Sequence, residues 1–165
     1  MQVVSNTSPV CNLAIIGRLD VLRGQFGAIQ IPEAVRVELA RLEHSGGRQA
    51  IDQAYADGWI RIQRLTSSDL SGVLSSSLDA GEAEVIALAI ESRANLLVID
   101  ETAGRAMARS LAITHTGTLG ILLKEKREGR IPSLGIEMDR LASDAGFFLS
   151  PRVRRTFLDA AGESG

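Results

Sequence analysis

The sequence Val3-Val4-Ser5-Asn6-Thr7-Ser8-Pro9 passes from a short apolar strand to the start of a helix. Thr7 and Ser8 carry hydroxyls that suit a helix cap, and proline is tolerated in the first helical turn. The same change recurs in Ile29-Gln30-Ile31-Pro32 and after Leu96-Leu97-Val98-Ile99. Strands that alternate with helices of crossover length predict a parallel sheet covered on both faces.

The other segments complete this α/β pattern. Strands are expected near 59–63 and 112–115. Helices are expected near 10–16, 19–25, 32–42, 48–56, 79–93, up to 111 and up to 127, with one or two more after Pro132. A break is expected at 45–47, and a Ser-rich connection with a helical turn at 66–77. We therefore expect three layers, α/β/α, around a central parallel sheet with extra C-terminal helices. Residues 1–130 would form the domain, and residues 131–165 a helical extension packed on it.

Composition narrows the class of protein. The chain has 165 residues, 45% hydrophobic and 23% charged, as in an ordinary globular domain. Its single cysteine, Cys11, excludes an internal disulfide and is expected to fill the core. No apolar run approaches the ~20 residues that span a bilayer, and the N-terminus lacks signal-peptide features. We expect a cytoplasmic protein without a membrane partner.

Polar residues lie at the ends of four of the five expected strands. They are Asn6, Pro32-Glu33, Asp100-Glu101 and His115-Thr116. In a parallel α/β sheet, ligands bind in the crevice beyond the carboxyl ends of the strands. The sequence therefore directs attention to a carboxamide and a carboxylate pair at two strand ends.

Three carboxylates are candidates for this site, each with a plainer interpretation. Glu38 lies beside the apolar stripe of its helix, where a solvated flank position is the alternative. Glu82 shares its face with buried positions, but Asp79-Ala80-Gly81-Glu82 also has capping-box spacing. Glu84 points about 200° away. Asp100 follows a buried strand and could simply cap the next helix.

Carboxylates gathered in one place repel each other unless a cation joins them. Magnesium takes one or two carboxylates plus water and phosphate oxygens, and such an ion can activate water for attack on phosphate. Other chemistries are poorly represented, since the sequence has no dinucleotide-binding glycine motif, Walker A loop or Gly-x-Ser-x-Gly elbow. His44 and His115 lack metal-ligand spacing.

Four segments in order resemble the PIN-domain superfamily, metal-dependent ribonucleases that include the toxins of VapBC-type toxin–antitoxin pairs. The resemblance is nearest to a prokaryotic PIN-like branch of uncharacterised function. The segments are Val4 to Pro9 with Gly17-Arg18-Leu19, Ile31 to Val35 with Glu38-Leu39, Asp79 to Glu84 with Ile86 to Ala89, and Leu97 to Glu101 with Arg105 and Thr116 to Gly120.

The resemblance implies that the family's acidic positions fall on Asn6, Glu38, Glu82 and Asp100. Of these, Asn6, Glu82 and Asp100 would hold Mg²⁺ or Mn²⁺, although the family's usual first residue is Asp and a carboxamide supplies no charge. Other residues implied to contact RNA are Thr7, Arg105 and Thr118. A homodimer and, in toxin members, an inhibitory antitoxin protein are also implied.

Two functions follow from these observations. The first is a divalent-metal-dependent endoribonuclease, for which the resemblance also implies the role of toxin in a toxin–antitoxin pair. The alternative, motivated by Asn6, is a catalytically weakened PIN-fold module that binds RNA or a partner protein. A phospho-receiver ranks below both because no lysine lies just beyond the last strand, where His115-Thr116-Gly117 stands.

Overall fold

The computed structural model describes residues 1–163, so residues 164–165 of the expected C-terminal extension lie outside the described part. Five strands alternate with ten helices over these residues, in the following order. The elements are β1 (Val3–Ser5), α1 (Thr7–Ile15), α2 (Asp20–Phe26), β2 (Ile29–Ile31), α3 (Glu33–Leu39), α4 (Ser45–Ala56), β3 (Ile60–Ile62), α5 (Asp69–Leu74), α6 (Ala80–Glu91), β4 (Leu96–Val98), α7 (Thr102–Ser110), β5 (His115–Thr116), α8 (Thr118–Arg127), α9 (Leu134–Ala145) and α10 (Pro151–Ala160).

All strand pairs are parallel, and the sheet order is β3-β2-β1-β4-β5. The chain moves outward from β1 to β3 and then returns to the other side of β1, where β4 pairs with it. The order therefore reverses between β1 and β4, and helices leave these two strands on opposite sides. Such a switch point opens a crevice at the carboxyl ends of the two strands.

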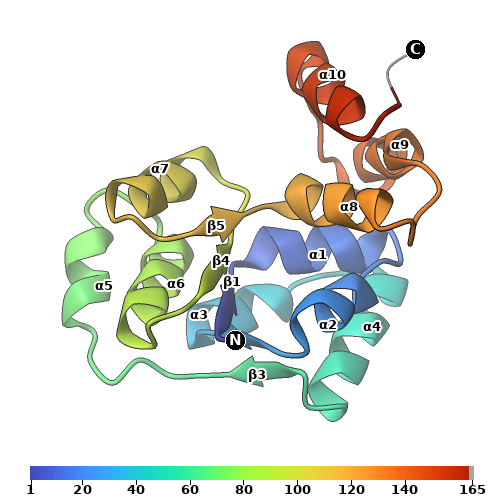
Figure 1. Cartoon of the computed structure of the whole chain (residues 1–165). Helices are drawn as coiled ribbons and strands as arrows, with labels where there is room; N and C mark the ends of the chain where they lie inside the picture. The colour runs from blue at the N-terminus through green and yellow to red at the C-terminus, as the bar shows by residue number, and fades with distance from the viewer. Residues whose placement is uncertain (164–165) are drawn as a thin grey trace.

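Helices cover both faces of the sheet, as Figure 1 shows. Helix α6 packs on β1 and β4, with α5, α7 and α3 against it, whereas α1, α2, α4 and α8 lie on the opposite side. The strands are apolar on both faces, and Val3, Val4, Leu97 and Val98 are fully buried. This burial is what an all-parallel sheet requires. The three-layer α/β/α prediction is confirmed.

Several element boundaries differ from the sequence-based predictions, and two of these differences have a clear local cause. Helix α4 begins at Ser45, not after the glycines, because Nδ1 of His44 accepts a hydrogen bond from the backbone N–H of Gly47 at 2.8 Å. Strand β5 begins at His115, later than the predicted start at residue 112. The turn that follows α7 extends through Ala112, which takes a left-handed conformation (φ 57°), so the strand starts after it. Both differences arise at turns, where local hydrogen bonds outweigh the hydrophobic pattern.

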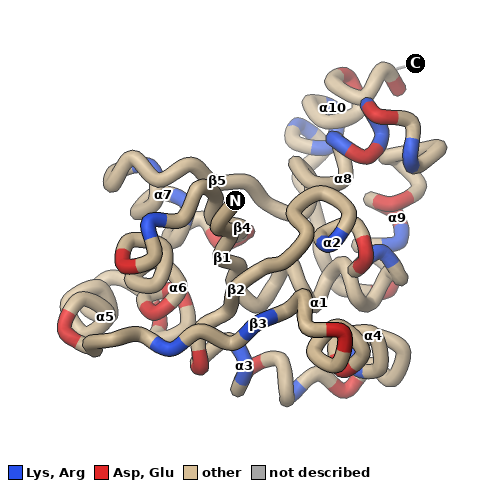
Figure 2. The backbone as a smooth tube through the Cα atoms, turned by 60° about the horizontal axis from the view of Figure 1, so that its bottom comes forward, with Lys and Arg blue, Asp and Glu red and all other residues tan. Residues whose placement is uncertain are grey.

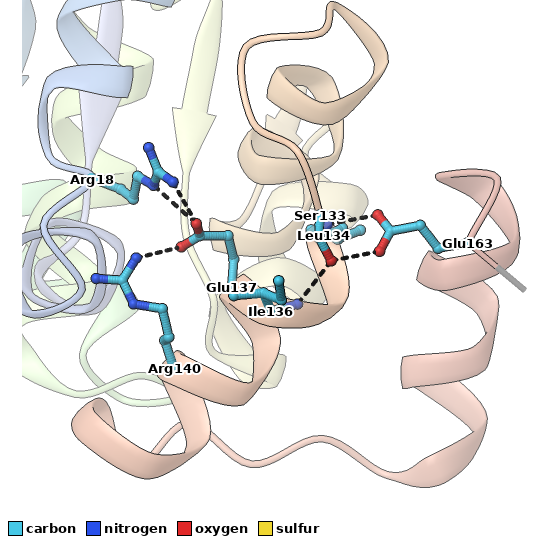
Figure 3. A network of polar contacts seen from close by, with 7 residues as sticks. All are labelled: Arg18, Ser133, Leu134, Ile136, Glu137, Arg140 and Glu163. Carbon is cyan, nitrogen blue, oxygen red and sulfur yellow. Dashed lines mark hydrogen bonds and ion pairs between the residues drawn. The ribbon is translucent and has the colours of Figure 1, made fainter.

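The C-terminal helices are fixed to the sheet domain by a polar network, drawn in Figure 3. The carboxylate of Glu137 on α9, only 2% exposed, accepts hydrogen bonds from Arg18 at 2.6 and 3.0 Å and from Arg140 at 3.4 Å. Glu163 accepts from the backbone N–H groups of Leu134 and Gly135 at 2.6 and 3.1 Å. The Arg18 contact ties α9 to the sheet domain, and the Glu163 contacts tie the chain that follows α10 to the start of α9.

No helix within residues 1–163 is both long enough and apolar enough to cross a membrane.

Candidate active site

Asn6 brings the ends of β1 and β4 together. Its backbone N–H donates to the carbonyl of Val98 at 2.9 Å, which continues the sheet by one residue. Its side-chain Nδ2 donates to Oε2 of Glu101 at 2.9 Å, and the hydroxyl of Ser8 donates to the other oxygen of the same carboxylate. Asn6 is 3% exposed, so this carboxamide is held in one orientation at the switch point.

Asp100 is held from the opposite side by the start of α8. Its carboxylate accepts the backbone N–H of Thr118 at 2.8 Å and the Thr118 hydroxyl at 2.7 Å, and Nδ2 of Asn12 at 3.4 Å. Asp100 therefore ties β4 to α8 and does not cap α7, the helix that it precedes. Burial raises the pKa of Asp100, the nearby charge of Glu101 adds to the rise, and the Thr118 hydrogen bonds oppose it.

Glu82 is buried at the first turn of α6. It forms a reciprocal capping box with Asp79, whose Oδ1 accepts the Glu82 N–H at 2.8 Å and whose own N–H donates to Glu82 Oε2 at 3.3 Å. The capping interpretation is thus confirmed. Burial raises the pKa of Glu82, and the charges of Asp79, Glu101 and Glu38 add to that rise. Glu82 therefore caps α6 and also lies close enough to Glu101 and Glu38 for their charges to raise its pKa.

Glu38 reaches the same region from α3. Its Oε2 accepts the hydroxyl of Thr7 at 2.7 Å, and its Oε1 lies where a Cβ on Gly81 would stand. A side chain at Gly81 would collide with this carboxylate. Glycine recurs at Gly117, where a Cβ would stand 2.6 Å from Asp100 Oδ1. Two glycines thus leave room for two of the site carboxylates.

The site has acids without cationic partners. Within residues 1–163, the acidic group of Glu38, Glu82, Asp100 and Glu101 forms no ion pair with Lys, Arg or His. In the same described part of the chain, no three Asp, Glu, His or Cys residues already form a cluster that could hold a metal ion. The arrangement is a loose group of carboxylates, with negative charge that a bound cation would offset.

The three residues expected to contact RNA differ in how accessible their side chains are to a ligand. The hydroxyls of Thr7 and Thr118 are both committed to carboxylates, and Thr118 is fully buried. Arg105 is exposed on α7 and lines a groove of about 500 Å³ that also has Asp100 in its wall. Of the three, Arg105 is the one placed for contact with a ligand.

Sequence reasoning missed Glu101, Ser8 and Asn12. Glu101 was visible as half of the carboxylate pair after β4, but the contact of its side chain with Asn6 depends on the register of β1 against β4. Asn12 is a buried polar residue within an otherwise apolar helix, which was a usable signal. Ser8 looked like a helix cap, whereas its hydroxyl bonds the Glu101 carboxylate.

A protein-family model described as a PIN domain matches residues 2–163. The chain belongs to the PIN-domain family. PIN domains are generally nucleases and typically use divalent metal ions, so this PIN domain is a nuclease-like module. The match includes α9 and α10 as well as the sheet. Comparison with curated proteins and with solved structures found no match.

Proposed function

We propose that this PIN domain is a ribonuclease that depends on Mg²⁺ or Mn²⁺. The observation that supports the proposal is the acidic group at the β1/β4 switch point, which lacks a cationic partner among the described residues. Two of its members have a raised pKa, and a divalent cation would relieve the repulsion that contributes to the rise.

The donor atoms of this group are of the chemical type that such an ion binds. All are carboxylate or carboxamide oxygens, which Mg²⁺ prefers, and Mg²⁺ needs only one or two protein carboxylates. Asp100 and Glu82 would hold the ion, with Asn6 as a neutral ligand. Nδ2 of Asn6 is engaged by Glu101, which leaves its carbonyl oxygen available for coordination. When bound, the ion would activate water and offset charge on the phosphate.

The chain's own residues would orient these ligands. Thr118 and Asn12 fix the Asp100 carboxylate, and Glu101 fixes the Asn6 carboxamide. Glu38, held by Thr7, would complete the acidic pocket. Pre-oriented ligands cost little reorganisation when substrate arrives.

Asn6 also motivates the alternative, a module that binds RNA or a partner protein without cleaving. Glu101 argues for the active form, because its carboxylate lies 2.9 Å from the Asn6 amide and supplies negative charge beside the uncharged residue. Asn6→Asp would place two carboxylates at this distance. Improved metal binding by that variant would indicate a weakened site.

The decisive test is RNA cleavage by wild type and Asp100→Asn, with Mn²⁺ and with EDTA, on single-stranded and structured RNA. We expect cleavage only with the metal ion, and a loss in Asp100→Asn on the order of 10²-fold or more. Glu84→Gln, on the same helix as Glu82 but outside the proposed ligand set, should cleave like wild type. Equal residual cleavage by wild type and Asp100→Asn would reject the nuclease.

Two partner proposals follow from family membership. The first is a homodimer, which light scattering on the purified chain would measure. The second is an antitoxin protein that blocks the site, which co-expression with the product of a neighbouring reading frame would test. Neither partner is needed for the cleavage experiment.

A further inference from the structure

The groove that has Asp100 and Arg105 in its wall is unusually aromatic for this chain. It runs over β5 and the start of α8, and the linker between α9 and α10 forms its other wall. Three of the chain's six aromatic residues line it, namely Phe147, Phe148 and Phe157. Phe147 and Phe157 pack against the core, but Phe148 is 79% exposed. A ring held at a groove yet open to water has a face available for stacking.

The anchoring of the C-terminal segment keeps this wall in place. Helix α10 contacts α8 and α9, above which it lies in Figure 1. Glu137 ties α9 to Arg18, and Glu163 ties the end of α10 to the start of α9. These contacts hold in place the two helices, α9 and α10, that flank the linker carrying Phe148.

The charges on the groove's two sides fit an anionic ligand. Arg105 on α7 lines the groove, and Arg152 on α10 lies one residue from the groove-lining Val153. Neither arginine forms an ion pair within residues 1–163, and Figure 2 shows basic residues on both helices. Arginine together with exposed aromatic rings is the combination that binds single-stranded nucleic acid, by phosphate contact and base stacking.

We propose that this groove is a nucleotide subsite in which a base of single-stranded RNA stacks on Phe148 while Arg105 contacts a phosphate. The inference rests on the proposed function, because Asp100, which lines this groove, belongs to the site where the scissile phosphate would be attacked. Single strands are required, since bases in a duplex have no free face. The subsite would favour substrates with an unpaired base beside the cleaved bond.

Binding in EDTA tests the subsite without cleavage. The probes are a short fluorescent oligoadenylate and an abasic ribose-phosphate oligomer of equal length, measured by anisotropy. We expect wild type to bind the oligoadenylate more tightly than the abasic oligomer. Phe148→Ala should weaken binding of the oligoadenylate about fivefold or more, because a stacked base contributes ~1–3 kcal/mol and fivefold corresponds to the lower end of that range. Binding of the abasic oligomer should not change.

Two control variants make the result specific. Phe148→Leu keeps an apolar side chain without a ring and should behave like Phe148→Ala, whereas Ile136→Ala removes another exposed apolar side chain of the C-terminal segment and should bind like wild type. Because Phe148 is exposed, none of these outcomes depends on folding.

Equal binding of both probes by wild type, or unchanged binding by Phe148→Ala, would overturn the subsite. The proposed nuclease is judged separately. Cleavage that survives in Phe148→Ala while base-dependent binding is unchanged would leave the nuclease and remove the subsite. Base-dependent binding without metal-dependent cleavage would leave the subsite and remove the nuclease.

Discussion

Two carboxylates of the acidic group, those of Glu38 and Asp100, lie beside a glycine that leaves space for them. Asp100 lies against Gly117, where a Cβ would stand 2.6 Å from Oδ1 and 3.3 Å from the carbonyl of Ile99. The backbone of Gly117 has φ −129°, a conformation that other residues adopt without strain. Its glycine is therefore explained by space beside Asp100 and not by backbone geometry.

We predict that Gly117→Ala reduces Mn²⁺-dependent RNA cleavage on the order of 10²-fold, because the new methyl group must displace the Asp100 carboxylate and small misplacements are costly in a catalytic site. Circular dichroism should remain that of wild type. Gly24→Ala, where nothing lies within 4 Å of the added Cβ, is the matched control and should cleave normally. Full activity in Gly117→Ala would show that the position of Asp100 is not critical.

Residue identities in the site were only partly predictable. Asn6 and Asp100 were found because both follow apolar strands, and polar residues at those positions meet at one edge of a parallel sheet. Glu101 was not assigned a role, because sequence does not say which of two adjacent carboxylates turns toward β1. That choice is made by side chains that are distant in sequence, Asn6 and Ser8.

At the scale of single elements, helices and buried strands were predictable and turns were not. The existence of α6 and β4 follows from continuous apolar runs, whereas the start of α4 depends on a His44 cap. The expected cap of α1 by Thr7 and Ser8 did not form, since both hydroxyls bond carboxylates of the site. Where a local preference competes with the site, the site contacts prevail.

The N-terminus of α9 is capped by Ser133, whose hydroxyl accepts the N–H of Ile136 at 3.1 Å, and also by Glu163, which lies beyond the end of α10. Glu163 accepts hydrogen bonds from the N–H groups of Leu134 and Gly135 and from the hydroxyl of Ser133 at 2.9 Å. Burial acts to raise the pKa of Glu163, but these bonds together with Lys126 outweigh it and the pKa is lowered. A carboxyl whose pKa is lower folded than unfolded stabilises the fold above its unfolded pKa, about 4.3, and this contribution is lost as pH falls through the folded value.

We therefore predict that Glu163→Gln lowers the free energy of unfolding at pH 7 by about 1 kcal/mol, a typical value for a lost cap. The difference from wild type should shrink as the pH falls through the folded pKa of Glu163. Urea titrations at several pH values measure this. Glu43→Gln, an exposed carboxylate with no hydrogen bond or ion pair to the described residues, should show no such difference. A pH-independent effect of Glu163→Gln would contradict a charged cap.

For the whole molecule, the strand order matters most. The reversal between β1 and β4 brings together residues 95 positions apart, as in the Asn6–Glu101 hydrogen bond. The sequence predicted the three layers, because fully apolar strands must be covered on both faces. It did not predict that the C-terminal segment would line a groove together with Asp100, because no periodicity in that segment indicates where it packs.

The central claim is that the acidic group at this switch point binds a divalent cation, and Glu82 allows the sharpest test of it. Glutamine can replace glutamate in a capping box, so Glu82→Gln keeps the cap of α6 and removes a proposed metal ligand. Calorimetric titration with Mn²⁺ should show one binding site in wild type and in Glu84→Gln, and a greatly weakened site in Glu82→Gln. Absence of Mn²⁺ binding by wild type, or undiminished binding by Glu82→Gln, would contradict the account.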